Sequence, residues 1–138
     1  MTKTYLLDSW AVLAYLKKES PADTRILDLL TKARQGTAKL LLSMINLGEV
    51  FYNVGRVRGE DFAESVLDEI RLLPIELLPV EEETVFAAAR WKMKYPLSYA
   101  DAFAATSAEQ HKATLLTGDP ELLALNDKLE IEALSRES

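Results

Sequence analysis

Thr4-Tyr5-Leu6-Leu7-Asp8-Ser9 combines a short apolar run with an acid placed directly after it. Its length and composition predict a buried β-strand over residues 4–7. A second run of this kind covers residues 113–116, and Asp119 follows it closely. In parallel sheets, catalytic and ligand-binding residues usually lie just beyond the carboxyl ends of the strands. If these two strands are parallel neighbours, the carboxyl groups of Asp8 and Asp119 share one edge of the sheet.

Along the rest of the chain, short apolar runs alternate with segments of helical periodicity. Ser20 is expected to cap the second helix, with Pro21 at its first position. Further strands are predicted over residues 39–42, 75–78 and 129–133, and helices over residues 10–18, 21–35, 44–58, 60–73, 81–94, 99–111 and a short stretch from 120. This alternation predicts an α/β fold, a three-layer α/β/α sandwich around a mainly parallel central sheet with right-handed crossovers.

Composition excludes several classes of protein. The 138 residues are expected to form one domain, residues 1–138, and contain no cysteine and one histidine, His111, so a disulfide scaffold, a thiol nucleophile and a multi-histidine zinc centre are excluded. No signal peptide or membrane span is recognisable, and a cytoplasmic location is expected. The formal net charge of −6 argues against a broad basic surface for nucleic acid, but not against a local basic strip.

Three of the acids that follow or open predicted elements have a second, purely structural interpretation. Asp119 precedes Pro120 in a typical helix N-cap arrangement, and Asp8 can cap the first helix. Asp101 lies three residues after Ser98, as in a capping box. From the sequence alone, each of these three acids can be either a helix cap or a catalytic residue.

Glu49 is framed by bulky apolar residues, with Ile45 and Tyr52 beside it on the predicted helix 44–58. Burying a carboxylate requires a partner for its charge. Two partners are open: the guanidinium of Arg56, one turn further along the chain from Tyr52, or a bound cation.

The acids discussed above lie in four segments whose order and approximate spacing resemble the PIN domain family. Within this family, the segments are most similar to the VapC-like toxins of toxin–antitoxin pairs. The resemblance covers essentially the whole chain and rests on Leu6-Leu7-Asp8-Ser9, Ser43-Met-Ile-Asn-Leu-Gly-Glu49, Tyr99-Ala-Asp101-Ala-Phe-Ala-Ala and Leu116-Thr117-Gly-Asp119-Pro-Glu-Leu. One departure is the pair Leu122-Leu123, where family members often have an aromatic residue shortly after the last acid.

The resemblance implies a PIN-like fold and a set of site residues. The expected metal ligands and catalytic acids are Asp8, Glu49, Asp101 and Asp119, with Thr117 as the supporting catalytic hydroxyl and Ser9 and Ser43 as smaller polar residues nearby. Oxygen ligands suit Mg²⁺ or Mn²⁺, and such a cation relieves the repulsion among clustered carboxylates. The implied activity is endoribonuclease hydrolysis of RNA phosphodiester bonds to 5′-phosphate and 3′-hydroxyl ends.

For a VapC-like toxin the implied partners are the RNA substrate and a small antitoxin protein whose tail lies across the acidic site. The apolar residues on both sides of the 44–58 helix, including Phe51 and Tyr52, suit a homodimer interface or an antitoxin groove. Alternatively this helix is enclosed in the core, since all-round hydrophobicity signals burial of either kind.

RNA contacts are expected from two basic segments, one with Arg56 and Arg58 and the other with Arg90, Lys92 and Lys94 beside Trp91 and Tyr95. Aromatic and basic side chains together can stack on bases and neutralise phosphates. A solvated helix end is the alternative for the second segment, because basic residues are favoured at helix C-termini.

Other functions remain to be separated. A phosphatase of the haloacid-dehalogenase type also places an acid after its first strand, but it needs a second acid two residues later, where this chain has Trp10. A PIN-like RNA-processing nuclease would use the same acids for another purpose. A non-catalytic RNA-binding protein with this fold would bind RNA without cutting it.

Overall fold

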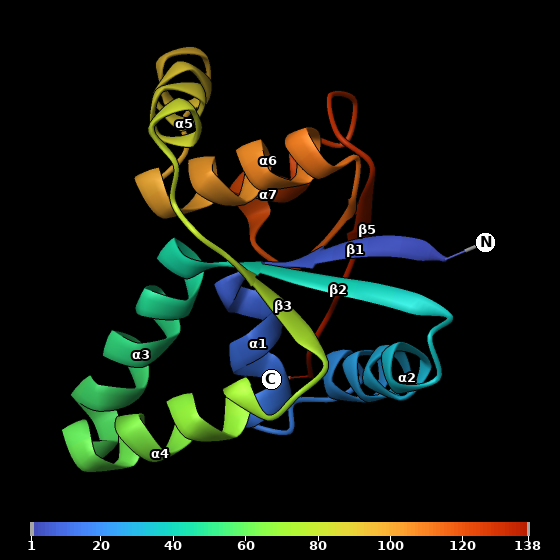
Figure 1. Ribbon diagram of the computed structural model, residues 1–138. Coiled ribbons are helices and arrows are strands. Elements are labelled where there is room, and N and C mark those ends of the chain that lie inside the picture. The colour runs from blue at the N-terminus through green and yellow to red at the C-terminus, as the bar shows by residue number, and fades with distance from the viewer. Residues whose placement is uncertain (1, 138) are drawn as a thin grey trace.

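The computed structural model describes residues 2–137, which form five strands and seven helices in alternating order (Figure 1). In chain order these are β1 (Lys3–Leu7), α1 (Ser9–Leu16), α2 (Ala22–Arg34), β2 (Ala38–Ser43), α3 (Met44–Arg58), α4 (Glu60–Arg71), β3 (Ile75–Leu78), α5 (Glu82–Lys94), α6 (Tyr99–His111), β4 (Thr114–Thr117), α7 (Pro120–Leu123) and β5 (Ile131–Ala133). The expected alternation of strands and helices is confirmed.

The five strands form one sheet in the order β3-β2-β1-β4-β5, and every neighbouring pair is parallel. β1 is central, and its Leu7 lies opposite Leu42 of β2 and Leu116 of β4. The carboxyl ends of these three strands therefore meet at one edge of the sheet. Asp8 follows β1 at that edge, between Ser43 and Thr117.

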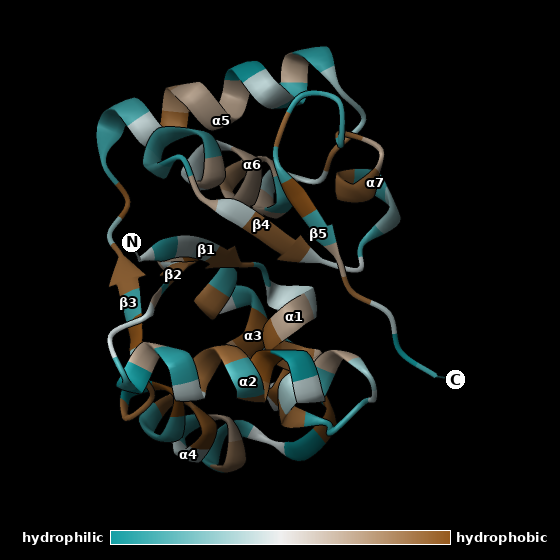
Figure 2. Ribbon diagram, turned by 90° about the vertical axis from the view of Figure 1, so that its right-hand side faces the viewer, coloured by the Kyte–Doolittle hydropathy of each residue, from teal (hydrophilic) through white to brown (hydrophobic). Residues whose placement is uncertain are grey.

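Helices cover both faces of the sheet, which confirms the expected α/β/α sandwich (Figures 1 and 2). Tyr5 and Leu7 of β1 pack into the core beneath α1, α2, α3 and α4. Leu6 points to the opposite core, beneath α5, α6 and α7. Such alternation is dictated by the two-residue period of a strand, so two apolar cores form on a sheet with no exposed face.

Local capping signals explain where several helices begin. Ser43 accepts a hydrogen bond from the backbone N–H of Ile45 and caps α3, and Ser98 accepts one from the N–H of Asp101 and caps α6. The helices expected over residues 44–58 and 99–111 have those boundaries, and the other helix boundaries lie within two residues of the expected ones.

The expected start of the second helix is wrong. α2 begins at Ala22, and Pro21 lies before it in an isolated antiparallel bridge with Arg136. The N–H of Ala22 donates to the carbonyl oxygen of Ser135, and the Ser20 hydroxyl donates to Asp23 instead of acting as a cap. The backbone pairing of Pro21 and Ala22 with the C-terminal segment thus accompanies a helix start that differs from the local signal.

None of the helices within residues 2–137 has the length and apolarity that crossing a membrane requires.

Candidate metal centre

Asp8 is the most buried acid at the carboxyl edge of the sheet, with 1% of its surface exposed. One carboxylate oxygen, Oδ1, accepts a hydrogen bond of 2.8 Å from the backbone N–H of Ala11, so Asp8 caps α1. The other, Oδ2, accepts a short hydrogen bond from the hydroxyl of Thr117. Both oxygens are therefore fixed in position. The prediction that Asp8 caps the first helix is confirmed, and Asp8 also binds Thr117 through its second oxygen.

Thr117 joins the two ends of the sequence at this edge. Its side chain is completely buried at the end of β4. While its hydroxyl donates to Asp8, its oxygen accepts a hydrogen bond of 3.0 Å from the backbone N–H of Asp119. Thr117, which the resemblance implies as a supporting hydroxyl, thus positions the backbone of Asp119 and the carboxylate of Asp8.

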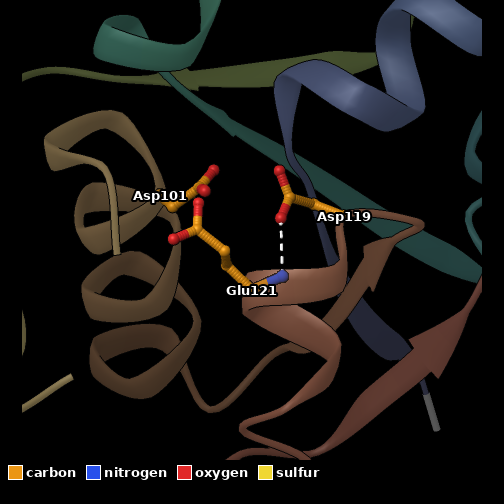
Figure 3. Close-up of side chains that lie close together, drawn as sticks. All are labelled: Asp101, Asp119 and Glu121. Atoms are coloured by element: carbon orange, nitrogen blue, oxygen red, sulfur yellow. Dashed lines mark hydrogen bonds between the residues drawn. The ribbon is translucent and has the colours of Figure 1, made fainter. Parts of the chain in front are cut away.

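Three carboxylates converge between α6 and α7 (Figure 3). Asp101, Asp119 and Glu121 each present an oxygen, and these oxygens all lie within 4.8 Å of one another. Asp119 also caps α7, with Oδ1 accepting a 2.8 Å hydrogen bond from the N–H of Glu121. Asp101 is buried in the first turn of α6, Asp119 is half-buried and Glu121 is exposed. The group therefore opens to solvent on the Glu121 side.

Glu49 lies near this group but outside its tightest part, as does Asp8. It is half-exposed in the middle of α3, and its Oε1 accepts a 2.5 Å hydrogen bond from the Ser9 hydroxyl. Arg56 does not pair with it, because the Arg56 guanidinium lies over the Tyr52 ring, 4.9 Å from its centroid. The Ser9 hydroxyl is the partner that the structure gives to Glu49.

Burial and the neighbouring carboxylates raise the pKa values of two acids in the site, Asp8 and Asp101. Burial raises the pKa of Asp8 from 3.8 to about 7, and the charges of Asp101 and Asp119 add to the rise, against the hydrogen bonds from Thr117 and Ala11. Burial likewise raises the pKa of Asp101 to about 7, aided by the charges of Asp119, Glu49 and Glu121. Both carboxyls therefore hold protons more tightly than an ordinary aspartic acid, because burial and the neighbouring negative charges disfavour their ionised forms.

The donor set fits a hard divalent cation. Carboxylate oxygens from Asp101, Asp119 and Glu121 lie close enough to share one ion, and Asp8 and Glu49 add further negative charge around them. Mg²⁺ and Mn²⁺ take such oxygen ligands and leave positions for water. A cation at this position would also favour the ionised forms of Asp8 and Asp101.

Glu121 was not predicted to be a site residue from the sequence. Its signal is weak: an acid in the first turn of a helix, two residues after Asp119. Asn46 was also missed. Its side chain is fully buried, and Nδ2 donates to the carbonyl oxygen of Ala100, which ties α3 to the first turn of α6 beside Asp101.

The basic residues expected to contact RNA do not gather in one place. Arg56 and Arg58 lie at the end of α3, with their guanidiniums over the rings of Tyr52 and Phe62. Arg90 lines a pocket beside α5. The ammonium group of Lys92 instead donates to the carbonyl oxygen of Leu97.

Comparison of the sequence with family models matches the PIN domain over residues 5–128. The chain belongs to the PIN domain family. A comparison with curated proteins found no match.

PIN domain structures from toxin–antitoxin pairs share this fold. A chain of the VapBC2 complex from Rickettsia felis, bound to a promoter DNA fragment, is 19% identical with a TM-score of 0.74, and the match covers 96% of this chain and 99% of that one. A toxin–antitoxin complex from Klebsiella pneumoniae is 13% identical, with a TM-score of 0.71 and coverage of 96% and 99%. VapC20 from Mycobacterium tuberculosis, a sarcin–ricin loop cleaving toxin, is 13% identical, with a TM-score of 0.66 and coverage of 88% and 94%.

Proposed function

We propose that this PIN domain protein is a Mg²⁺- or Mn²⁺-dependent endoribonuclease and the toxin component of a VapBC-type pair. The observation that carries the proposal is the group of three carboxylates, Asp101, Asp119 and Glu121, with oxygens within 4.8 Å of one another at the carboxyl edge of the sheet. Three negative charges this close repel each other strongly without a cation. Membership of the PIN domain family supports the nuclease assignment.

In this proposal Asp101, Asp119 and Glu121 hold the cation, together with Asp8 and Glu49. The bound ion supplies Lewis-acid activation of water and neutralises charge on the RNA phosphate. Thr117 fixes Asp8 through its hydroxyl, and Ser9 fixes the carboxylate of Glu49. These two hydrogen bonds restrict the acids to single orientations, so little reorganisation is needed when cation and phosphate bind.

The antitoxin assignment is supported by the toxin–antitoxin structures that share the fold. α3 is not enclosed on all sides: Leu47 and Val50 are buried, whereas Met44 and Tyr52 are 39% and 47% exposed. Between α3 and α4 an open groove of about 250 Å³ is lined by Met44, Leu47, Gly48, Phe51, Glu64, Leu67 and Arg71. We assign this groove, next to Glu49, to an apolar segment of the antitoxin.

A homodimer and a cytoplasmic site of action complete the proposal. The exposed apolar side chains that a dimer would cover include Tyr52 on α3 and Met93 on α5, the latter 81% exposed. Sedimentation of the purified protein, alone and with its antitoxin, measures both assemblies.

The proposal is tested by comparing the wild type with Asp101→Asn on a defined RNA, in Mn²⁺ and in EDTA. Cleavage is expected for the wild type in Mn²⁺ alone, while Asp101→Asn folds but does not cleave. Asp68→Asn, which removes an exposed acid on α4, is the matched control and should cleave like the wild type. Cleavage in EDTA, or equal cleavage by Asp101→Asn, contradicts the assignment.

The same preparations separate the alternatives. RNA binding without cleavage in Mn²⁺ indicates a non-catalytic RNA-binding protein. Hydrolysis of p-nitrophenyl phosphate without RNA cleavage indicates a phosphatase. Cleavage that no antitoxin inhibits indicates an RNA-processing nuclease.

A further inference from the structure

A pocket of about 340 Å³ lies between α5, α6 and the segment before β5, away from the acidic group. Besides Ala87, it is lined by Arg90, Trp91, Lys94, Tyr95, Glu109 and Lys128. Three cationic side chains from two distant parts of the sequence thus surround two aromatic rings. Figure 2 shows α5 and α6 packed together on one side of the sheet, with α7 beside them.

The aromatic pair in this pocket is available for stacking. The rings of Trp91 and Tyr95 are half-buried, with centroids 5.3 Å apart, and Trp91 packs against the core. Among residues 2–137, no arginine or lysine lies over either ring. The rings near the other basic segment differ, because guanidiniums lie over Tyr52 and Phe62.

The cations of the pocket are also available. Arg90 and Lys94 are exposed and form no ion pair with any acid in the described part of the chain. Lys128 makes one exposed ion pair of 3.3 Å with Asp127, which contributes little and is easily exchanged for a phosphate. A local excess of positive charge in a protein of net charge −6 points to an anionic ligand.

We propose that this pocket binds single-stranded RNA, with Arg90, Lys94 and Lys128 holding phosphates and a base stacking on the Trp91–Tyr95 pair. Phosphate neutralisation combined with aromatic stacking is how single strands are commonly held. The proposal rests on the proposed ribonuclease function and adds a second contact region for its substrate. Glu109 lies eight residues along α6 from Asp101, about 12 Å at 1.5 Å per residue, so a strand of several nucleotides reaches both regions.

Removing the charge of Glu109 should change RNA affinity in the opposite direction to removing a cation of the pocket. It is the one carboxylate among the pocket's lining residues, and it repels a phosphate held by the three cations. Glu109→Gln keeps the shape of the side chain and removes this charge. It should therefore strengthen RNA binding severalfold, whereas removal of a cation weakens it. A structural role for the basic end of α5 predicts neither change.

The test measures binding of a fluorescent single-stranded RNA of twelve nucleotides in EDTA, where cleavage is not expected. We expect Arg90→Ala/Lys94→Ala to weaken binding about tenfold. The negative slope of the logarithm of the association constant against the logarithm of the salt concentration should become less steep by up to about 1.4. This is about 0.7 for each phosphate that the variant no longer neutralises. The matched control is Lys17→Ala/Arg34→Ala, which removes two exposed charges from the ends of α1 and α2 and should bind like the wild type.

Equal weakening of binding in the two double variants, or no gain for Glu109→Gln, overturns the proposal. Equal binding of a duplex RNA also overturns it, because duplex bases cannot stack on the aromatic pair. Failure of the ribonuclease function is distinguishable, since the wild type would then bind RNA through this pocket without cutting it in Mn²⁺. If instead cleavage is present and the pocket variants bind normally, only the pocket is excluded.

Discussion

The hydroxyl of Thr117 donates a hydrogen bond to Oδ2 of Asp8, across 109 positions of sequence and at the centre of the sheet's carboxyl edge. We expect Thr117→Val, which keeps the shape and removes the donor, to lower the free energy of unfolding at pH 8 by about 1–3 kcal/mol, because a buried carboxylate oxygen is left without its partner. Urea unfolding measures this. At pH 5, where Asp8 is protonated, the effect should be smaller.

Thr117→Ser is the control for that substitution, since it retains the hydroxyl. Its RNA cleavage rate in Mn²⁺ should remain near that of the wild type, while Thr117→Val loses activity. If Thr117→Val and Thr117→Ser behave alike, the hydrogen bond to Asp8 does not matter for either property.

Gly118 leaves the space that the indole of Trp10 fills. A Cβ at this position would lie 2.3–2.5 Å from three atoms of the ring, so Gly118→Ala must displace Trp10 or the backbone between Thr117 and Asp119. We expect the free energy of unfolding to fall by about 1–3 kcal/mol, as for other overpacked sites, with reduced cleavage and a shift in Trp fluorescence. Gly48→Ala on α3, with nothing within 4 Å, is the control and should stabilise slightly.

The raised pKa values of Asp8 and Asp101 predict how stability depends on pH. Because each rises from 3.8 to about 7 on folding, the folded chain binds more protons between these values, and both groups destabilise it increasingly as pH rises through this window. In EDTA, the stability of Asp101→Asn relative to the wild type should therefore grow from pH 5 to pH 8, by up to about 1.4 kcal/mol per pKa unit. A difference that stays constant with pH would refute this.

Glu121 is expected to contribute to cation affinity although it is exposed. Glu121→Gln removes one of the three clustered carboxylates, so the Mn²⁺ concentration for half-maximal stabilisation should rise about tenfold, as measured by thermal unfolding. Glu60→Gln is a matched control, because Glu60 occupies the first turn of α4, as Glu121 does in α7. Equal Mn²⁺ titrations of both variants would exclude Glu121 as a ligand.

Asn46 is expected to keep Glu49 and Asp101 in register by bonding to the carbonyl oxygen of Ala100. Asn46→Ala should cost about 1–3 kcal/mol in urea unfolding, because it removes a fully buried side chain and its hydrogen bond to α6. Asn53→Ala removes a comparable amide hydrogen bond to the Glu49 carbonyl on a less buried turn and should cost less than about 1 kcal/mol. Equal costs would mean that burial at α3–α6 adds nothing.

Features set by a few neighbouring residues could be predicted from the sequence. α6 begins after Ser98 as expected because the cap is a contact between that residue and the N–H of Asp101. The sheet followed from the spacing of apolar runs. Ser20 failed as a cap because Pro21 pairs with Arg136, far away in the chain.

Partners of the acids could not be predicted, because they depend on tertiary packing. Ser9 meets Glu49 only once α1 and α3 lie side by side, so Arg56 was the nearer candidate in sequence. Glu121 meets Asp101 only through the packing of α6 beside α7. The catalytic roles of Asp8, Glu49, Asp101, Asp119 and Thr117 stay predictions until the variants are measured.

The central place of β1 has a consequence for biosynthesis. Because β1 has β2 on one side and β4 on the other, its second flank stays unpaired until Thr114–Thr117 has been made. Asp8 therefore lacks Thr117, and Asp101 lacks Asp119, until those residues have been synthesised. A growing chain therefore cannot bring the three clustered carboxylates together before Glu121 has been synthesised.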